Sequence, residues 1–257
     1  MLRGLYIAGS GMTERAANME VVANNIANMQ SNTFKRDRVV LSSFREMMLE
    51  HMQVGQKNRE IGTMALGASA ASDTYTDFTQ GPLTLTGNPN DVAIDGKGFV
   101  KLALPDGAIR YTRDASWEIN PDGTLVDKSG NPILDDNESP IKINTIGPID
   151  IKDTGEIIQA GQNVGKIGMI EITDTKLLEK DGNATYKLRN GIDSGSVEQK
   201  PTDTILRQSN VERANFSPVD AVIDMITVLR EYESSSKVLQ VIDESVAQAI
   251  TKLGAVQ

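Results

Sequence analysis

The 257-residue chain contains no cysteine, and it has only one histidine. The lack of cysteine excludes disulfides, thiolate nucleophiles and cysteine-ligated metal sites together, and it fits a protein exported from the cytoplasm. The single histidine, His51, lies between Glu50 and Met52 with no serine or aspartate arranged around it as in a catalytic triad. A solvated helical position is the simplest interpretation for His51. We therefore predict a protein that is not an enzyme and has no catalytic residue and no cofactor.

Long apolar runs are also missing. None approaches the roughly 20 residues that a membrane-spanning helix needs, and Gly4, Gly9 and Ser10 interrupt the N-terminal stretch where a signal peptide would have its apolar region. The sequence therefore predicts no membrane span. If the protein leaves the cytoplasm, it needs another export route.

Charge is unevenly distributed along the chain. The net charge is −9, but the first 60 residues carry eight Lys or Arg against six Asp or Glu, which leaves −11 on the remainder. This acidic remainder argues against nucleic acid as a partner. The acidic run from Asp135 to Glu138 lacks the ligand spacing and central glycine of a calcium loop, so we predict a polar turn and no metal site.

Both ends of the chain have the apolar periodicity of amphipathic helices. The apolar residues step by four and three, which is typical of the contact seam of a coiled coil. We expect a first helix from about Gly4 to Met29, with Asn32 as a left-handed cap, and a last helix opened by Ser217 and Pro218. The seam residues are Met12, Ala16, Met19, Ala23 and Ile26 in the first segment, and Val222, Ile226, Leu229, Leu239, Ile242, Val246, Ala249 and Leu253 in the last.

The last helix carries a polar interval from Glu233 to Ser236, between the two runs of its seam. We expect the apolar stripe to weaken there and to shift its phase.

The middle of the chain has the pattern of an antiparallel β domain. Turn dipeptides such as Asp95-Gly96 and Asp106-Gly107 recur every 8 to 12 residues, and side chains alternate between them. Tyr111 and Trp117 are six residues apart, so we expect them on one face of a strand, packed in the core. Residues 35–54 read as a helical or extended piece, and residues 62–72 as a hinge or flexible connector.

Three asparagines, Asn24, Asn25 and Asn28, interrupt the end of the first helix although asparagine is a mediocre helix former. One interpretation is an amide ladder that hydrogen-bonds neighbouring helices and fixes their register. The other is three solvated amides near a fraying helix end.

Motifs in three stretches, taken in order, resemble a known family. The first runs from Ala23-Asn24-Asn25-Ile26-Ala27-Asn28 to Phe34-Lys35-Arg36. The second runs from Thr79-Gln80-Gly81-Pro82-Leu83 to Asp95-Gly96-Lys97-Gly98-Phe99, followed by Tyr111-Thr112-Arg113. The third runs from Ser209-Asn210-Val211 to Arg230-Glu231-Tyr232-Glu233. Over nearly the whole chain they resemble the bacterial flagellar rod and hook family of axial proteins, and the length and the start Met1-Leu2-Arg3-Gly4-Leu5-Tyr6 resemble its basal-body rod members of the FlgF or FlgG type.

The resemblance implies an α+β protein, with a discontinuous helical domain made of the paired N- and C-terminal helices and a mainly antiparallel all-β central domain. We expect a helical assembly domain at 1–34 and 212–257, connecting segments at 35–78 and 196–211, and the β-rich outer domain at 79–195. The family usually has glycine where this chain has Thr33. We expect Asn32 to take the positive φ angle instead.

The resemblance also implies a function. The chain would be a homo-oligomeric subunit of the basal-body rod, exported by the flagellar type III apparatus, polymerised helically with other rod and hook axial proteins, and located outside the cytoplasm in the periplasm and cell envelope. The alternative is a monomeric β-rich surface or binding module. The predicted assembly residues are Met12, Met19, Asn24, Asn25, Ile26, Asn28, Val222, Ile226, Leu229, Leu239, Ile242 and Val246.

Overall fold

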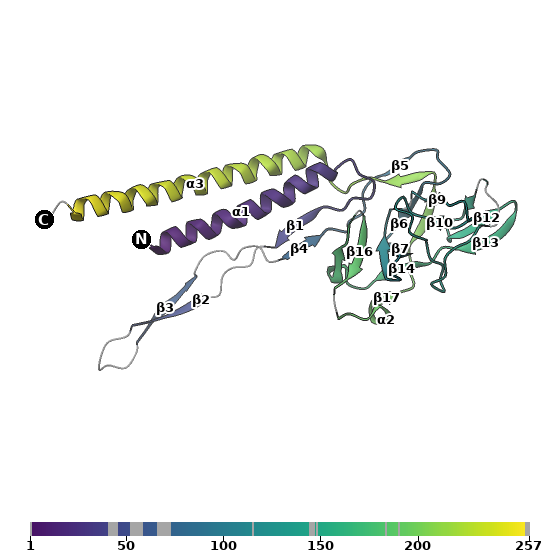
Figure 1. Cartoon of the computed structure of the whole chain (residues 1–257), viewed down its shortest axis with the longest axis horizontal. Helices are drawn as coiled ribbons and strands as arrows, with labels where there is room; N and C mark the ends of the chain where they lie inside the picture. The colour runs from purple at the N-terminus through teal and green to yellow at the C-terminus, as the bar shows by residue number, and fades with distance from the viewer. Residues whose placement is uncertain are drawn as a thin grey trace. The chain divides into compact units, whose positions relative to one another are not determined.

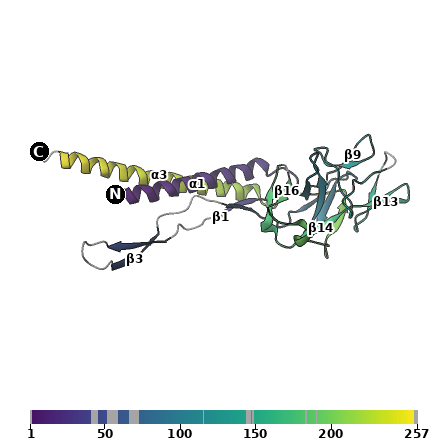
Figure 2. The same cartoon turned by 60° about the horizontal axis from the view of Figure 1, so that its bottom comes forward.

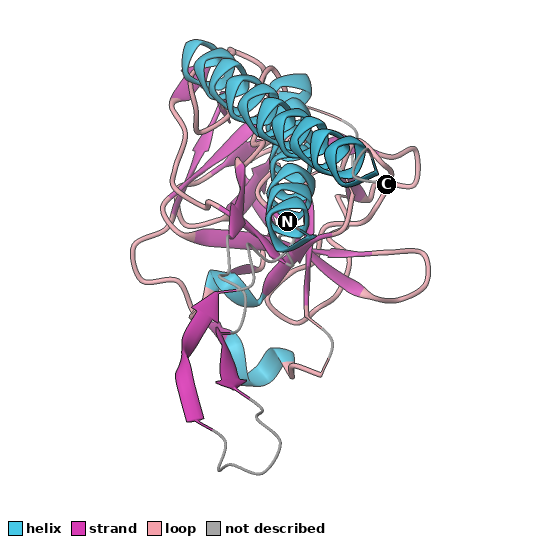
Figure 3. Ribbon diagram, turned by 90° about the vertical axis from the view of Figure 1, so that its left-hand side faces the viewer, coloured by secondary structure: helices cyan, strands magenta, loops and turns pink. Residues whose placement is uncertain are grey.

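The computed structural model describes residues 2–40, 46–51, 59–65, 73–114, 116–143, 147, 149–182, 184–189 and 191–254. The chain forms two compact units, and each is described by itself. The helical unit consists of Met1–Ala27, Asp37–Tyr75 and Pro218–Gln257, and the β unit consists of Asn28–Arg36 and Thr76–Ser217. The expected α+β class is confirmed, with a helix at each end of the chain and antiparallel strands between them (Figure 3).

Two long helices dominate the helical unit and run alongside each other (Figure 1, Figure 2). They are α1 (Leu2–Asn28) and α3 (Pro218–Gly254). The predicted start of α3 is confirmed, since proline at the first helical position and Asp220 in the first turn suit a helix N-terminus. Arg15 of α1 lies 3.8 Å from the carboxylate of Glu231 on α3.

The residues on the less exposed side of α3 recur at alternating intervals of four and three, an unbroken heptad repeat. Ala221 and Val228 are buried and the other positions of this inner stripe are half-buried. The stripe continues through Ser235 without a shift, so the expected change of phase within the polar interval does not occur in it. The inner stripe is Ala221, Met225, Val228, Tyr232, Ser235, Leu239, Ile242, Val246 and Ala249.

The helical unit also holds two pairs of strands. Strand β1 (Asp37–Val40) pairs with β4 (Asp73–Thr76), and β2 (Glu46–His51) pairs antiparallel with β3 (Arg59–Ala65). The part of residues 35–54 that the structure describes is therefore extended. His51 lies in a strand, so the helical position predicted for it is wrong. Of the expected hinge, residues 62–65 belong to β3, and residues 66–72 lie outside the described residues.

The largest element of the β unit is a six-stranded antiparallel sheet. Strands β7 and β8 form its centre, and Val100 of β7 pairs with Thr112 of β8. The order is β15 (Leu178–Lys180), β16 (Thr185–Leu188), β8 (Ile109–Thr112), β7 (Gly98–Ala103), β14 (Met169–Ile172) and β17 (Glu198–Gln199).

Smaller antiparallel sheets complete the β unit, together with the short helices η1 (Thr175–Leu177) and α2 (Ser194–Val197). Two of these sheets join the end of the β unit to its start, because a late strand pairs with an early one. The small sheets are β6 (Val92–Asp95) with β18 (Ile205–Gln208), β5 (Leu83–Leu85) with β19 (Asn210–Glu212), β9 (Glu118–Ile119) with β10 (Leu125–Val126), and β11 (Asp150–Ile151) with β12 (Glu156–Gln159) and β13 (Gln162–Lys166).

The β unit has two clusters of buried apolar side chains. Trp117 and Ile157 belong to one cluster, and Tyr111 and Phe99 to the other. Tyr111 and Trp117 are both buried, as predicted, but they do not share a strand face. Strand β8 ends at Thr112, so the chain has left the sheet before Trp117.

Candidate functional site

The five residues 32–36, which follow the end of α1, are joined to the five residues 212–216, which precede α3. Both segments belong to the β unit, and we call them together the helix-root clamp. Every residue of the first segment contacts the second through a hydrogen bond, an ion pair or a ring contact. The contacts are Asn32 with Arg213, Thr33 with Glu212, Phe34 with Phe216, Lys35 with Glu212, and Arg36 with Asn215.

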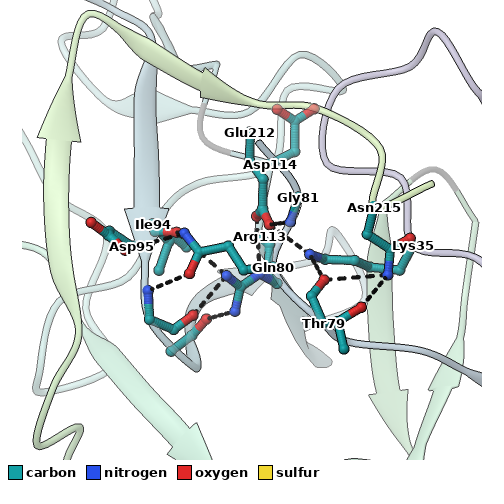
Figure 4. Close-up of polar contacts among 12 residues, drawn as sticks. Lys35, Thr79, Gln80, Gly81, Ile94, Asp95, Arg113, Asp114, Glu212 and Asn215 are labelled. Atoms are coloured by element: carbon teal, nitrogen blue, oxygen red, sulfur yellow. Dashed lines mark hydrogen bonds and ion pairs between the residues drawn. The ribbon is translucent and has the colours of Figure 1, made fainter. Parts of the chain in front are cut away.

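The centre of the clamp is the fully buried carboxylate of Glu212 (Figure 4). Its Oε1 accepts hydrogen bonds from Lys35 Nζ at 2.6 Å and from the Gly81 backbone N–H at 2.8 Å. Its Oε2 accepts one from Arg113 Nε at 3.2 Å. Charge-assisted hydrogen bonds of this kind are stronger than neutral ones, so one carboxylate joins three segments that are distant in the sequence.

Lys35 is a cation with no exposed side-chain surface. Besides Glu212, its ammonium donates to the carbonyl oxygen of Thr79 at 2.8 Å. Burial is the largest influence on Lys35 and the charge of Arg113 is the next, and together they outweigh Glu212 and lower the pKa of Lys35 to about 8. Two buried cations therefore share one carboxylate.

Arg113 is held on its remaining sides by backbone oxygens. Its guanidinium donates to the carbonyl oxygens of Gly98 at 2.9 Å and Gly96 at 2.8 Å, and it lies 5.6 Å from the ring centre of Phe99. Only 2% of its side chain is exposed. Because these charged groups are almost fully enclosed and bound to one another and to backbone oxygens, the arrangement is suited to holding structure.

Asn215 and Gly81 complete the clamp. Asn215 accepts from the Arg36 N–H at 3.0 Å and donates to the Asp77 carbonyl oxygen at 2.7 Å. Arg36 directly precedes strand β1 and Asp77 directly follows strand β4, so Asn215 joins the chain just before the first of these strands to the chain just after the last. A side chain at Gly81 would overlap the carbonyl oxygen of Arg213. Glycine is therefore required where residue 81 approaches the clamp.

Thr33 adopts a left-handed backbone conformation with φ of +54°, and Asn32 does not. The prediction that Asn32 would take the positive φ angle is therefore wrong, as is its role as a left-handed cap. A tertiary contact explains the difference, because the Thr33 N–H donates to the Glu212 carbonyl oxygen at 2.8 Å. The buried hydroxyl of Thr33 has no hydrogen-bond partner among the described residues.

Asn25 is buried and binds the backbone of its own chain. Its amide donates to the carbonyl oxygen of Asp37 at 2.9 Å and accepts from the Asp37 N–H at 3.0 Å. The NH2 group and the carbonyl oxygen of the Asn25 side chain thus both bind β1 of the same chain. This differs from an amide ladder between neighbouring helices. Asn24 is exposed and Asn28 is half-buried.

The apolar residues predicted for assembly lie on different faces. On α3, Leu239, Ile242 and Val246 belong to the inner stripe, whereas Val222, Ile226 and Leu229 are exposed. On α1, Met12, Met19 and Ile26 are half-buried, and the most buried positions are Glu14, Val22 and Asn25.

The sequence reasoning did not find the pair Lys35 and Glu212, which are 177 residues apart. A signal was present, because the first two of the stretches that carried the family resemblance contain Lys35 and Arg113, and Glu212 directly follows Ser209-Asn210-Val211, the motif that opens the third. One ionisable residue in or beside each of three distant motifs is the pattern that a shared buried ion network produces.

Three protein-family models match the chain. They are the flagella basal body rod protein at residues 5–33, the flagellar hook protein FlgE/F/G D1 domain at 93–162, and the flagellar basal body rod FlgEFG protein C-terminal at 207–252. The flagellar basal-body rod protein FlgF of Caulobacter vibrioides is 32% identical over 257 residues and spans all of both chains. The chain belongs to the flagellar basal-body rod protein family.

Relatives of this rod protein include both FlgF and FlgG proteins. The flagellar basal-body rod protein FlgG of Buchnera aphidicola from Schizaphis graminum is 31% identical over 263 residues, covering 95% of this chain and 97% of its own. FlgG of Buchnera aphidicola from Acyrthosiphon pisum is 32% identical, with the same coverage. The rod protein therefore has a structural role in the bacterial flagellum, and among its described residues no helix is long and apolar enough to cross a membrane.

Proposed function

We propose that this rod protein polymerises helically through its terminal helices to build the hollow flagellar rod, after export by the flagellar type III apparatus. Its partners would be further copies of itself and other rod and hook axial proteins, in the periplasm and cell envelope. It would carry no cofactor and catalyse no reaction.

A second apolar face on α3 carries this proposal. Exposed apolar residues recur at helical spacing over the first three turns and form an outer stripe. Each of these residues is between 41% and 66% exposed. At about 100° per residue, this stripe lies on a separate side from Ala221 and Val228 of the inner stripe. The outer stripe is Val219, Val222, Ile223, Ile226 and Leu229.

A helix that is apolar on two sides is typical of the interior of a larger assembly. The inner stripe can be covered within the chain, because α1 runs alongside α3 (Figure 1, Figure 2). Among the described residues nothing covers the outer stripe, whose side chains are exposed, and contiguous exposed apolar surface usually marks an interaction site. Three of the predicted assembly residues, Val222, Ile226 and Leu229, belong to it.

The first helix supports the same proposal. Its apolar residues Met12, Met19 and Ile26 lie to one side of its most buried face, which is formed by Glu14 and Asn25 among others. Part of this apolar surface therefore also remains open in the single chain. Two unlike apolar surfaces on one subunit suit a head-to-tail contact, and such a contact extends into a helical polymer when it does not close into a ring.

The test compares two aspartate variants in the same turn of α3. Ile226→Asp places a charge on the outer stripe, where assembly would bury it without a partner at a cost of several kcal/mol. Thr227→Asp places the same charge at the adjacent exposed position outside the stripe. Each variant replaces the native gene, and secretion of the subunit, rod formation and swimming are measured.

We expect both variants to be secreted, and only Ile226→Asp to lose rods and motility. Normal rods and motility with Ile226→Asp would show that the outer stripe is not an assembly surface. Purified Ile226→Asp subunits should melt at the same temperature as the native monomer. A lowered melting temperature would place Ile226 in the packing of the single chain and contradict the proposal.

A further inference from the structure

We propose that the Glu212 carboxylate is a shared lock, which makes residues 32–36 and residues 212–216 bind to the rest of the β unit and detach from it as one cooperative element. This conformational device is distinct from assembly of the rod. It follows from the charge balance of the helix-root clamp and from the positions of its hydrogen bonds.

The charge balance makes the two segments depend on each other. With Glu212 in place, Lys35 and Arg113 each have a counter-charge at hydrogen-bonding distance. If residues 212–216 detach, the two buried cations are left without that carboxylate and repel each other. A buried charge without its partner is strongly unfavourable, so residues 32–36 must leave as well.

The reverse dependence rests on the backbone. When residues 32–36 detach, the Glu212 carbonyl oxygen loses the Thr33 N–H and its carboxylate loses Lys35. The side chain of Asn215 loses the Arg36 N–H at the same time. The N–H groups of Thr33 and Arg36 therefore become exposed in the same event in which residues 212–216 lose three of the contacts that hold them.

The three charged groups are not equivalent, and this gives the proposal a specific signature. Removing the charge of Glu212 leaves two cations in one enclosed site. Removing the charge of Lys35 leaves Glu212 paired with Arg113 and with the Gly81 N–H. Neutralising Lys35 should therefore destabilise the clamp far less than neutralising Glu212. When Glu212 is already neutral, neutralising Lys35 as well should restore part of the lost stability, because it removes one of the two cations.

The experiment is native-state hydrogen exchange of the full-length monomer, resolved by residue. The reporters are the N–H groups of Thr33, Arg36 and Arg213; the last of these donates to the Pro82 carbonyl oxygen at 2.9 Å. In the native protein all three should exchange through openings of equal free energy. Glu212→Gln should accelerate all three by the same factor, about 100-fold or more.

Three further variants complete the test. Lys35→Met should accelerate the reporters by less than about tenfold, consistent with loss of one partner of a still-paired carboxylate. Lys35→Met with Glu212→Gln should exchange more slowly than Glu212→Gln alone. The control Glu198→Gln removes a carboxylate that binds Lys101 at 2.6 Å, outside the clamp, and should leave the reporters unchanged.

Unequal acceleration of Thr33 and Arg213 in Glu212→Gln would overturn the proposal, because the two segments would then open independently. Purely additive effects in the double variant would also overturn it. If Glu212→Gln alone fails to fold, the double variant decides: a folded double variant supports the shared carboxylate, and an unfolded one contradicts it.

Discussion

Replacing Thr33 by glycine should stabilise the β unit, although glycine normally destabilises a folded chain. Thr33 is a β-branched residue with φ of +54°, and its backbone is held there by the bond to Glu212. Left-handed backbone costs a residue with a Cβ atom roughly 1–2 kcal/mol. The buried Thr33 hydroxyl, which has no hydrogen-bond partner in the described part of the chain, adds about 1 kcal/mol or more.

The opposing contributions are smaller. Relative to threonine, glycine lacks the methyl group, the hydroxyl and the Cβ atom. Loss of the methyl packing costs about 0.8 kcal/mol, and having glycine in place of a residue with a Cβ atom costs about 0.4–1 kcal/mol more, chiefly because the unfolded chain becomes more flexible. We therefore expect Thr33→Gly to stabilise the unit by about 1 kcal/mol. Thr33→Ala removes the hydroxyl but keeps the backbone strain, so it should be less stable than Thr33→Gly by about 0.5–1 kcal/mol.

The assay is urea unfolding followed by the fluorescence of Trp117, which is the only tryptophan and is buried in the β unit. The same pair of substitutions at Thr84, an exposed position in strand β5 without positive φ, serves as control. At Thr84 alanine should be the more stable variant, as in ordinary strands. If alanine is also the more stable at Thr33, the strain argument is refuted.

Two other predictions use the same fluorescence assay. The first concerns pH: the pKa of Lys35 is about 8 in the folded chain against 10.5 for an ordinary lysine, so the unfolded chain binds more protons between these values. The free energy of unfolding should therefore rise by up to about 3 kcal/mol from pH 8 to pH 10.5, and Lys35→Met should abolish this rise; a native profile that falls in this range would contradict it. The second concerns boundaries: a fragment of residues 28–217 should unfold cooperatively, whereas a fragment of residues 79–195 should be unfolded or aggregated, because it leaves Arg113 without Glu212. A cooperative transition in the shorter fragment would show that the clamp is dispensable for the fold.

The sequence was sufficient for features that depend on neighbouring residues. The start of α3 is set by Pro218 and Asp220, which favour a helix N-terminus in any context. The antiparallel strands follow from local turns and alternating side chains. These signals need no information about distant parts of the chain.

The sequence was insufficient where distant segments decide the outcome. The side chain of Thr33 disfavours a left-handed backbone. Thr33 adopts one nevertheless, because its N–H is bound by the carbonyl oxygen of Glu212. The predicted seam on α3 combines residues of two faces, because the helix is apolar on both and periodicity alone does not tell which face meets α1. The hydrogen bonds of the Asn25 side chain form only because the chain folds back and brings the backbone of Asp37 next to it.

The central claim is that the outer stripe of α3 becomes buried when the subunit assembles into the rod. The chain has no cysteine, so Ile226→Cys provides a single thiol whose labelling rate reports the exposure of that position. The rate is measured in the purified monomer and in isolated basal bodies from a motile strain that carries the variant. Our account predicts rapid labelling of the monomer and strong protection in the rod. Equal labelling rates in the two states would contradict it.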